Sequence, residues 1–310
     1  MRDAECAVVV NVRTDLVATL ALASAATLDT PVLLVNCEPT EASRSHFAHL
    51  QARLGFRSID APIRSHGETL DRLFRTTLSA DRVFLLDSDA EVRDAAVVED
   101  MCDRIVGHPK VYGAGWLVDA QWLDERRGAT RGAAWHAERP WMPCVMFRTD
   151  AIRAALEAGH SFAADVVYND LWFSRRMSAV LARRFQDSYV AETPVLQRLP
   201  RRMREGLRRV RLSRLAFLRA DFDGVRPNYV MFDTGADIHR WCRREQGLEY
   251  AIADRALAHH VSHYDGVTRA ALHGDGHGLG DLANVDTEVR ERLARYGIDP
   301  PATPADPPPS

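Results

Sequence analysis

Residues 82–92 read RVFLLDSDAEV, an apolar run that leads into two aspartates separated by one serine. The run does not alternate between apolar and polar residues, which is typical of a strand buried on both faces of a parallel sheet. Open α/β sheets bind their ligands at the carboxyl ends of the strands. We therefore predict that Asp87 and Asp89 lie at the binding edge of a central sheet.

Two strand-and-helix units are predicted before this segment. Residues 7–12 and 31–36 are short apolar runs typical of buried strands, and helical patterns cover 15–28, 40–54 and 67–79. Strands that alternate with helices predict an α/β fold with a mostly parallel central sheet, flanked by helices and joined by right-handed crossovers.

The second half of the chain is less regular. Strands are predicted at 111–119 and 144–148, a loop from 226, and helices at 149–158, 169–184, 200–220, 235–246 and 287–296. We expect one domain, in which a first region (1–110) continues into a second (111–298). The proline-rich end, 299–310, is expected to be disordered.

Composition excludes few classes of protein. The chain has 310 residues, 46% of them hydrophobic, and a formal net charge of −3, which argues neither for nor against a nucleic-acid partner. No such partner is expected, because no other motif supports one. Its five cysteines form no CxxC pair, which favours a cytoplasmic protein without a disulfide framework. No apolar run is long enough to span a bilayer, so any membrane contact would be peripheral.

Asp87 and Asp89 have the chemistry of a metal site. Two carboxylates separated by one residue can act on one divalent cation, and hard oxygen ligands suit Mg²⁺ or Mn²⁺. Such cations share their coordination shell with substrate phosphates, and they neutralise charge on a departing diphosphate. A pair of surface acids without a metal is the alternative reading of this motif.

The segment VFLLDSDAEV, together with the helix entry Ser65-His66-Gly67-Glu68, resembles the GT-A glycosyltransferases, especially family 2-like members. The resemblance extends over about residues 6–270. It implies a metal-dependent hexosyltransferase-like enzyme that moves a sugar from a nucleotide-diphosphate sugar to an acceptor hydroxyl, by an inverting mechanism. Region 1–110 would then bind the nucleotide sugar, and region 111–298 would bind the acceptor and complete the metal shell.

The resemblance also assigns residues to the donor. They follow the first two strands, surround the D-x-D motif or lie near the end of the domain: Asn11, Arg13, Thr14, Glu38, His66, Ser88 and Arg269. Cap or turn roles remain open for Asn11 and Thr14, and a solvated loop position remains open for Glu38.

The acceptor side is expected to supply a general base. Asp170 matches the final acid of the family, but Asn169 stands where a glutamate usually precedes it, so inverting and retaining transfer both remain open. Asp165 is the second candidate for the base. The alternative for Asp170 is an acid at a helix N-terminus, where the helix dipole favours negative charge.

Histidines and tryptophans supply further candidates. The resemblance implies that His263, or else His260, completes the metal shell. His259 and His263 are four residues apart, so on a helix they would share one face and could bind zinc. Side chains that could stack on a sugar, or simply fill the core, are Trp135, Trp141 and Trp172.

Residues 198–219 are densely basic with interleaved apolar residues. They form either a solvated helix face or a surface for an anionic or lipid-linked acceptor or an anionic membrane. Two other functions stay open for the chain. One is a haloacid-dehalogenase-type phosphatase that uses Asp87 and Asp89, although Glu91 stands where that family has Thr or Val. The other is a non-catalytic nucleotide-sugar-binding relative.

Overall fold

The computed structural model describes residues 4–123, 134–168, 229–264, 267 and 282–301. Several sequence predictions lie outside these residues: the helices at 169–184 and 200–220, the basic segment 198–219, and all but the first three residues of the proline-rich end.

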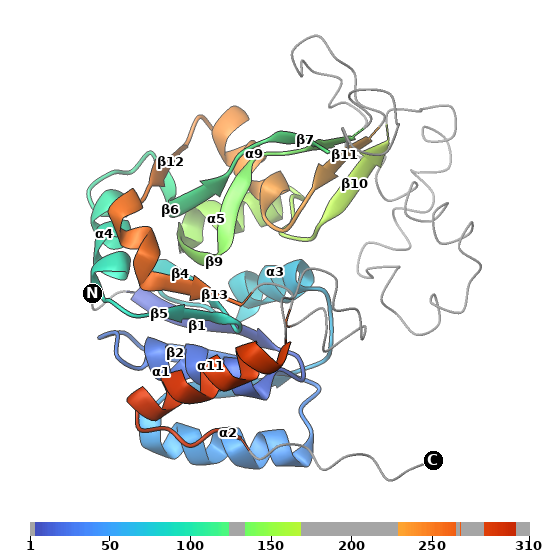
Figure 1. The fold of residues 1–310 in the computed structure, drawn as a ribbon. Helices are drawn as coiled ribbons and strands as arrows, with labels where there is room; N and C mark the ends of the chain where they lie inside the picture. Colours follow the sequence, from blue (N-terminus) through green and yellow to red (C-terminus); the bar gives the residue numbers. More distant parts are fainter. Residues whose placement is uncertain (1–3, 124–133, 169–228, 265–266, 268–281, 302–310) are drawn as a thin grey trace, which may run out of the picture.

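A seven-stranded sheet in the order β12-β6-β9-β4-β1-β2-β3 forms the centre of the fold (Figure 1). Its strands are β1 (Ala4–Asn11), β2 (Val32–Cys37), β3 (Arg57–Ala61), β4 (Arg82–Asp87), β6 (Val111–Val118), β9 (Arg139–Arg148) and β12 (Glu249–Ile252). Neighbouring strands pair in parallel except at β9, which is antiparallel to both β4 and β6. The predicted α/β fold with a mostly parallel sheet is confirmed.

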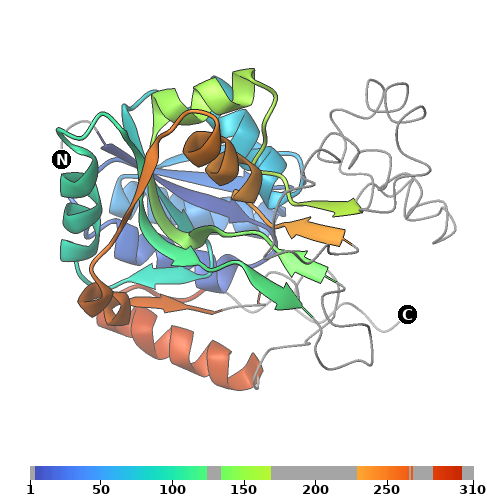
Figure 2. The same ribbon diagram turned by 90° about the horizontal axis from the view of Figure 1, so that it is seen from above.

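Helices cover both faces of this sheet (Figure 2). They are α1 (Asp15–Ala25), α2 (Glu41–Leu54), α3 (His66–Thr76), α4 (Ala96–Ile105), α5 (Thr149–Glu157), α9 (Ala236–Arg244) and α11 (Leu282–Arg295). Side chains of a strand point alternately to the two faces. In β4, Phe84 and Leu86 pack with α1, α2, α4 and α11, whereas Val83 and Leu85 pack with α3, α5 and α9. The strand is buried on both sides, as its sequence predicts.

Two smaller sheets lie beside the central one. The first has the order β10-β11-β8-β7, with β7 (Gln121–Leu123), β8 (Ala134–His136), β10 (Asp165–Tyr168) and β11 (Tyr229–Phe232). The second pairs β5 (Ala90–Val92) with β13 (Val261–His263), which follows the 3₁₀ helix η2 (Arg255–His260). None of the described helices is long and apolar enough to cross a membrane.

The structure corrects several predicted elements, and it adds strands that were not predicted: β3, β5, β7, β8, β10, β12 and β13. A strand, β11, lies within the loop predicted from 226, and α11 begins at Leu282 instead of 287. Strand β9 begins at Arg139 instead of 144 and includes Pro140 and Pro143. Proline cannot donate to a β ladder and so argues against a central strand. The pairing of β9 with β6 shifts register between Gly115 and Leu117 of β6, and Leu117 is opposite Pro140. The prolines thus lie where the ladder between these two strands is irregular.

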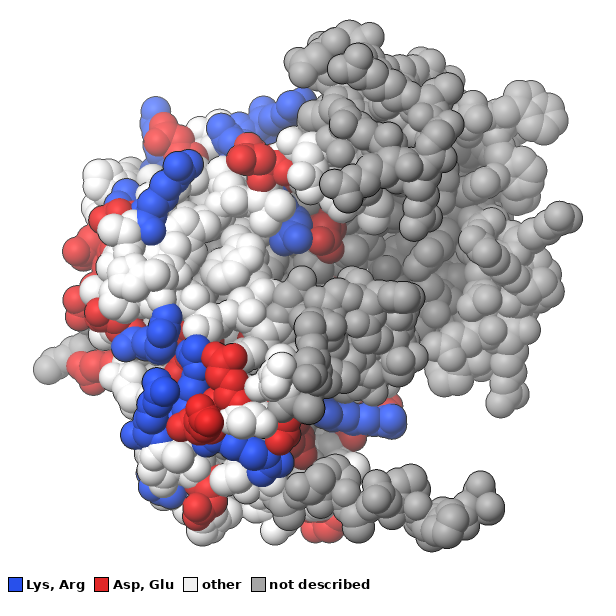
Figure 3. Space-filling view, viewed as in Figure 1, with Lys and Arg blue, Asp and Glu red and all other residues white. Residues whose placement is uncertain are grey.

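Charged side chains are mixed on the face seen in Figure 3. Acidic and basic residues alternate there, and on α11 they form ion pairs one helical turn apart, such as Arg290 with Asp286 at 2.6 Å. Within the described residues this face therefore carries no large patch of one sign.

The start of α3 is held in place by a cap and by close packing. Ser65 and Glu68 form a capping box, in which the Ser65 hydroxyl accepts from the Glu68 amide at 3.2 Å. A Cβ atom at Gly67 would lie 2.4 Å from the backbone of Ala163. Only glycine therefore allows the first turn of α3 to approach this chain segment, and His66 is fixed beside it.

Replacing Gly67 by Ala should destabilise the protein by about 3 kcal/mol, because the methyl group would have to displace backbone atoms. Gly247, which has a φ of 62° and open space around it, is the control. Gly247→Ala should cost only about 1 kcal/mol for its left-handed backbone. Urea unfolding of both variants measures the difference, and equal losses would contradict the packing argument.

Candidate functional site

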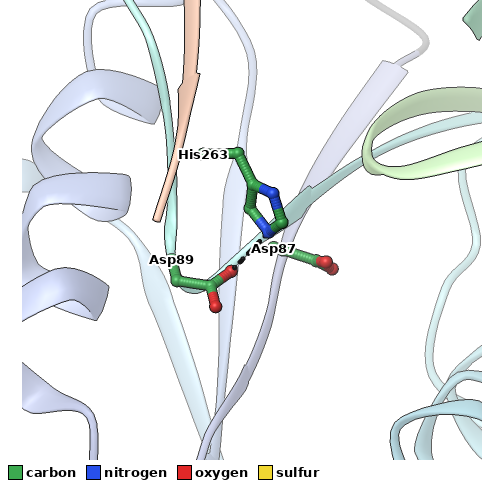
Figure 4. Close-up of side chains that lie close together, drawn as sticks. All are labelled: Asp87, Asp89 and His263. Carbon is green, nitrogen blue, oxygen red and sulfur yellow. Dashed lines mark ion pairs between the residues drawn. The ribbon is translucent and has the colours of Figure 1, made fainter. Parts of the chain in front are cut away.

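Asp87, Asp89 and His263 come together at the carboxyl edge of the central sheet (Figure 4). Asp87 is the last residue of β4, Asp89 lies in the turn before β5, and His263 ends β13. One ligand atom from each side chain lies within 4.8 Å of the others. Asp89 is buried, with 7% of its surface exposed, while Asp87 and His263 are half-buried. The arrangement offers two carboxylates and one imidazole to a single cation.

Strand pairing brings His263 to the aspartates. In the antiparallel pair of β13 and β5, His263 is opposite Ala90, and the Tyr264 amide donates to the Asp89 carbonyl at 2.8 Å. The His263 Nε2 atom lies 3.4 Å from Asp89 Oδ1. The prediction that His259 and His263 share a helix face is wrong, because the 3₁₀ helix ends before His263, which lies on a strand.

His260 lies away from this group. Its Nε2 atom is 3.6 Å from Asp94 Oδ2, and its carbonyl accepts from the Arg93 amide. Among the described residues, the cluster with the spacing of a metal site contains His263 and not His260.

An ion pair from α11 joins the two strands that carry the cluster. Arg292 Nη1 bonds both to the Glu91 carboxylate on β5 and, at 2.9 Å, to the Ser262 hydroxyl on β13. The Tyr296 hydroxyl donates to the other Glu91 oxygen at 3.0 Å. Glu91 is only 2% exposed, so its charge depends on these partners. The sequence analysis missed Arg292, because nothing in a helical pattern shows which strand the helix will meet.

His66 reaches the metal cluster from the start of α3. Its Nε2 atom is 3.4 Å from Asp87 Oδ1, close enough for an ion pair but not aligned as a hydrogen bond. Burial raises the pKa of Asp87 above its ordinary value, and the Asp89 carboxylate raises it further, while His66, His263 and Arg139 lower it. Burial is the largest of these effects, so the charged form of Asp87 is disfavoured until a further cation approaches.

Buried polar atoms without hydrogen bonds gather at this edge. Five such side-chain atoms occur among the described residues: His66 Nε2, Glu68 Oε1, Asp87 Oδ1, Trp116 Nε1 and Arg82 Nε. All except Arg82 Nε lie on the residues around the cluster. Folded proteins satisfy most buried polar groups, and exceptions need an explanation such as an ion or a ligand. The donor set, two carboxylates and an imidazole, fits a divalent cation.

An aromatic wall stands next to His263. The ring of Trp141 on β9 meets the His263 ring edge to face at 5.7 Å, and Trp116 on β6 meets Trp141 at 5.8 Å. Because β9 runs antiparallel to β4 and β6, its first residues lie at the same edge as the last residues of β6. Trp141 is one of the predicted stacking residues, whereas the sequence analysis missed Trp116. The side chains of Trp135 and Trp172 lie outside the described part of the structure.

Asn11 and Thr14 belong to a buried hydrogen-bond network. The Asn11 amide donates to Asp15 at 2.6 Å and to Asn36 at 3.0 Å, and its oxygen accepts from both the amide and the hydroxyl of Thr14. Asn11 is only 1% exposed. The Asn36 amide continues the network to Ser43. These bonds fix the turn between β1 and α1, and side-chain contact of Asn11 and Thr14 with a nucleotide stays a prediction.

Arg13 and Glu38 are exposed at the same edge, and both have unusual backbones. Their φ angles are 56° and 44°, and Val10 has 40°. These are the non-glycine residues with positive φ in the described chain, and all three are at the ends of β1 and β2. Such strained residues are rare and cluster at functional sites. The positive φ angles are compatible with the predicted nucleotide-binding role of Arg13 and Glu38, which stays a prediction.

Other predicted site residues are only partly described. Ser88 is buried, and its hydroxyl lies 3.5 Å from the Val10 carbonyl. Asp165 begins β10, opposite Phe232 of β11, and nothing is described of its side chain. Asp170 and Arg269 lie outside the described residues. A carboxylate that the sequence analysis missed is Asp233, which pairs with Arg139 at 2.8 Å.

No family model and no curated protein match the chain. Among solved structures it is similar to a mannosyltransferase from Pyrobaculum calidifontis in complex with GDP-Man and Mn²⁺, with 14% identity and a TM-score of 0.38. That match covers 50% of this chain and 47% of the other. It is also similar to glucosyl-3-phosphoglycerate synthase from Mycobacterium tuberculosis, with 12% identity, a TM-score of 0.33, and coverage of 48% and 58%.

A third similar structure is a cytidylyltransferase from Leptospira borgpetersenii, with 10% identity, a TM-score of 0.34, and coverage of 51% and 65%. The matched region thus spans about half the length of the mannosyltransferase and less than two thirds of the other two. The likeness is to GT-A-type glycosyltransferases and a nucleotidyltransferase. At these TM-scores it remains a likeness, and the residues of the site carry the functional inference.

Replacing Asp87 by Asn should raise the melting temperature of the metal-free protein at pH 7. The pKa of Asp87 is raised in the folded state, so its charge costs stability above that pKa. The gain should shrink as the pH falls through the folded pKa, because Asp87 is then protonated in the folded protein. Melting curves at pH 7 and pH 4.5 test this.

The same variant should lose stabilisation by Mn²⁺, since it loses a charged ligand. Asp286→Asn, in a partly exposed ion pair on α11 away from the cluster, is the control and should change neither property. A metal-free Asp87→Asn protein that melts below the wild type at pH 7 would contradict the account.

Replacing Arg292 by Gln should destabilise the protein by about 3–5 kcal/mol, because it leaves the buried Glu91 carboxylate without its cation. It should also weaken Mn²⁺ binding, because the guanidinium that bonds to both Glu91 on β5 and Ser262 on β13 is lost. Urea unfolding and calorimetric Mn²⁺ titration measure the two effects. Arg290→Gln, in a partly exposed ion pair with Asp286 on the same helix, should cost less than about 1 kcal/mol and leave Mn²⁺ affinity unchanged. Similar losses in both variants would show that the Glu91 pair has no special role.

Proposed function

We propose that this protein is a metal-dependent glycosyltransferase, which moves a sugar from a nucleotide-diphosphate sugar to an acceptor hydroxyl. The convergence of Asp87, Asp89 and His263 within 4.8 Å carries the proposal, because these ligands stand at the carboxyl edge of a mostly parallel sheet. The buried polar atoms around them that lack hydrogen bonds support a polar ligand at the same place.

The three clustered side chains would hold Mn²⁺ or Mg²⁺. Oxygen-rich sites favour these ions, and they keep coordination positions open for phosphate oxygens and water. When bound, the cation would neutralise charge that develops on a departing nucleotide diphosphate. His66 stands on the other side of Asp87 at the start of α3, where its ring can donate to a diphosphate oxygen.

The nucleoside would lie across the ends of β1 and β2. Glu38 and Arg13 are exposed there on strained backbones, while the network of Asn11 and Thr14 holds the turn between β1 and α1. We propose that the Glu38 carboxylate accepts hydrogen bonds from the ribose or the base, and that Arg13 contacts the nucleotide. Arg269, which lies outside the described residues, remains a proposed phosphate ligand.

The transferred sugar and the acceptor would lie on the other side of the metal, over β9 and β6. Trp141 and Trp116 offer aromatic faces there, and the buried Trp116 indole N–H has no hydrogen-bond partner among the described residues. Asp170, or else Asp165, is proposed as the base that takes the acceptor proton in an inverting transfer. The basic segment 198–219 is proposed to meet an anionic or lipid-linked acceptor or an anionic membrane surface. Cytoplasmic localisation also stays a proposal.

The two alternative functions predict different reactions. A haloacid-dehalogenase-type phosphatase would use an aspartate as a nucleophile and release phosphate from a phosphate ester. Glu91, in the motif that suggests this family, is instead held by Arg292 and Tyr296. A non-catalytic relative would bind the nucleotide sugar and leave it intact. The transferase explains the metal ligands and the strained ends of β1 and β2 together.

The test is to incubate the protein with UDP-glucose or GDP-mannose and to measure release of UDP or GDP, with and without Mn²⁺. We expect slow metal-dependent release, because water can replace the missing acceptor. Asp89→Asn should lower Mn²⁺ affinity by about 10-fold or more and reduce release in parallel. Asp286→Asn should match the wild type.

Three results would count against the proposal. Tight metal-dependent binding of both donors with no release would favour the non-catalytic relative. Phosphate release from a sugar phosphate would favour the phosphatase. Donor binding that does not depend on metal would remove the role of the Asp87, Asp89 and His263 cluster.

A further inference from the structure

A cavity of about 560 Å³ lies at the edge of the sheet opposite the metal cluster. The start of β4, the end of β9, the end of α4 and the start of α5 surround it. Its volume is within the range of small-molecule sites. Because β4 runs from this cavity to the metal cluster, the two sites are at opposite ends of one strand, and a ligand here would not overlap the donor site.

Two arginines stand directly opposite each other in its wall. In the antiparallel pair of β4 and β9, Arg82 is the partner of Arg148, and both line the cavity. Residues that are directly opposite share one face of the sheet, and like charges in such positions repel. Arg148 is neutralised by Asp150, which accepts from its Nε at 3.1 Å and from its Nη2 at 2.5 Å.

Arg82 has no such compensation in the described residues. No carboxylate there forms an ion pair with it, and its Nε atom is buried without a hydrogen-bond partner. Among the residues that the structure describes, this is the one buried unpaired side-chain atom that lies away from the metal cluster. A guanidinium held in this way, beside a second arginine, is expected to attract an anion.

Other charges of the wall leave it positive. Arg153 is tied to the carbonyls of Phe74 and Leu78, at 2.9 and 2.5 Å, which orient its guanidinium but do not neutralise it. His108 also lines the cavity. The negative charges of the wall are Asp81 and Asp150, and Asp150 is already paired with Arg148. The wall thus has three arginines and two aspartates.

We propose that this cavity is a second ligand site, which binds the phosphate group of a small molecule with Arg82 as its main donor. Phosphate oxygens accept the planar, charge-assisted hydrogen bonds that a guanidinium offers. An anion in the cavity beside Arg82 would neutralise its charge and supply the partner that Arg82 Nε lacks. This site goes beyond the proposed transfer reaction and does not depend on it.

The experiment uses the Asp87→Asn, Asp89→Asn double variant, in which the metal edge is disabled, in metal-free buffer. Inorganic phosphate and glucose 6-phosphate are titrated into it by calorimetry. Both should bind. Adding Arg82→Gln should weaken binding by about 10-fold or more, because a charged hydrogen bond is lost. Arg82→Lys, which keeps the charge but loses the planar fork, should be weakened less.

Arg290→Gln in the same background is the control for a lost surface arginine and should bind as before. Tighter binding of glucose 6-phosphate than of phosphate would identify a phosphorylated metabolite, and equal binding would identify free phosphate. Melting curves show whether each variant is folded. If Arg82→Gln does not fold, the affinity of Arg82→Lys is used in its place. Unchanged affinity after substitution of Arg82, or no binding of either probe at millimolar concentration, would overturn the proposal.

Discussion

The buried ion pair between Glu91 and Arg292 holds together the part of the molecule on which the candidate site depends. Asp89 lies two residues before Glu91, and His263 lies one residue after Ser262, which bonds to the same guanidinium. The pair therefore sets the distance between two of the three proposed metal ligands. A buried pair of this kind adds little net stability, but it is costly to break, so it selects one arrangement of the strands.

Several features at the carboxyl edge of the sheet are unfavourable for the free energy of folding. Asp87 has a buried carboxylate oxygen beside a second carboxylate, and Arg13 and Glu38 have left-handed backbones. Each of these features opposes folding, and each is tolerated because the surrounding core is extensive and tightly packed. The Phe84 and Leu85 side chains, fully buried on opposite faces, show how firmly β4 is anchored below the site. Because β4 is firmly packed, the protein tolerates strained residues at the carboxyl edge of the sheet.

Local signals explain what the sequence could predict. The buried strand β4, the aspartates that follow it and the capping box at Ser65 are all set by neighbours in the chain, and each was predictable. His263 was found through a family resemblance, but its strand was not, because three residues of β13 acquire their structure only by pairing with β5. Trp116, Arg292 and Asp233 were missed for the same reason. Their roles arise from contacts between distant segments, and a single sequence contains no record of such contacts.

The long separation between Glu91 and Arg292, 201 residues, also has a consequence for synthesis. A ribosome that adds about 5–20 residues per second needs roughly 10–40 s to make Arg292 after Glu91. Until β13 has been made, β5 lacks its partner strand, and until Arg292 has been made, the buried Glu91 carboxylate lacks its cation. The nascent chain therefore cannot form the three-ligand cluster before His263 has emerged, and the ion pair that braces the cluster forms only after α11 has emerged.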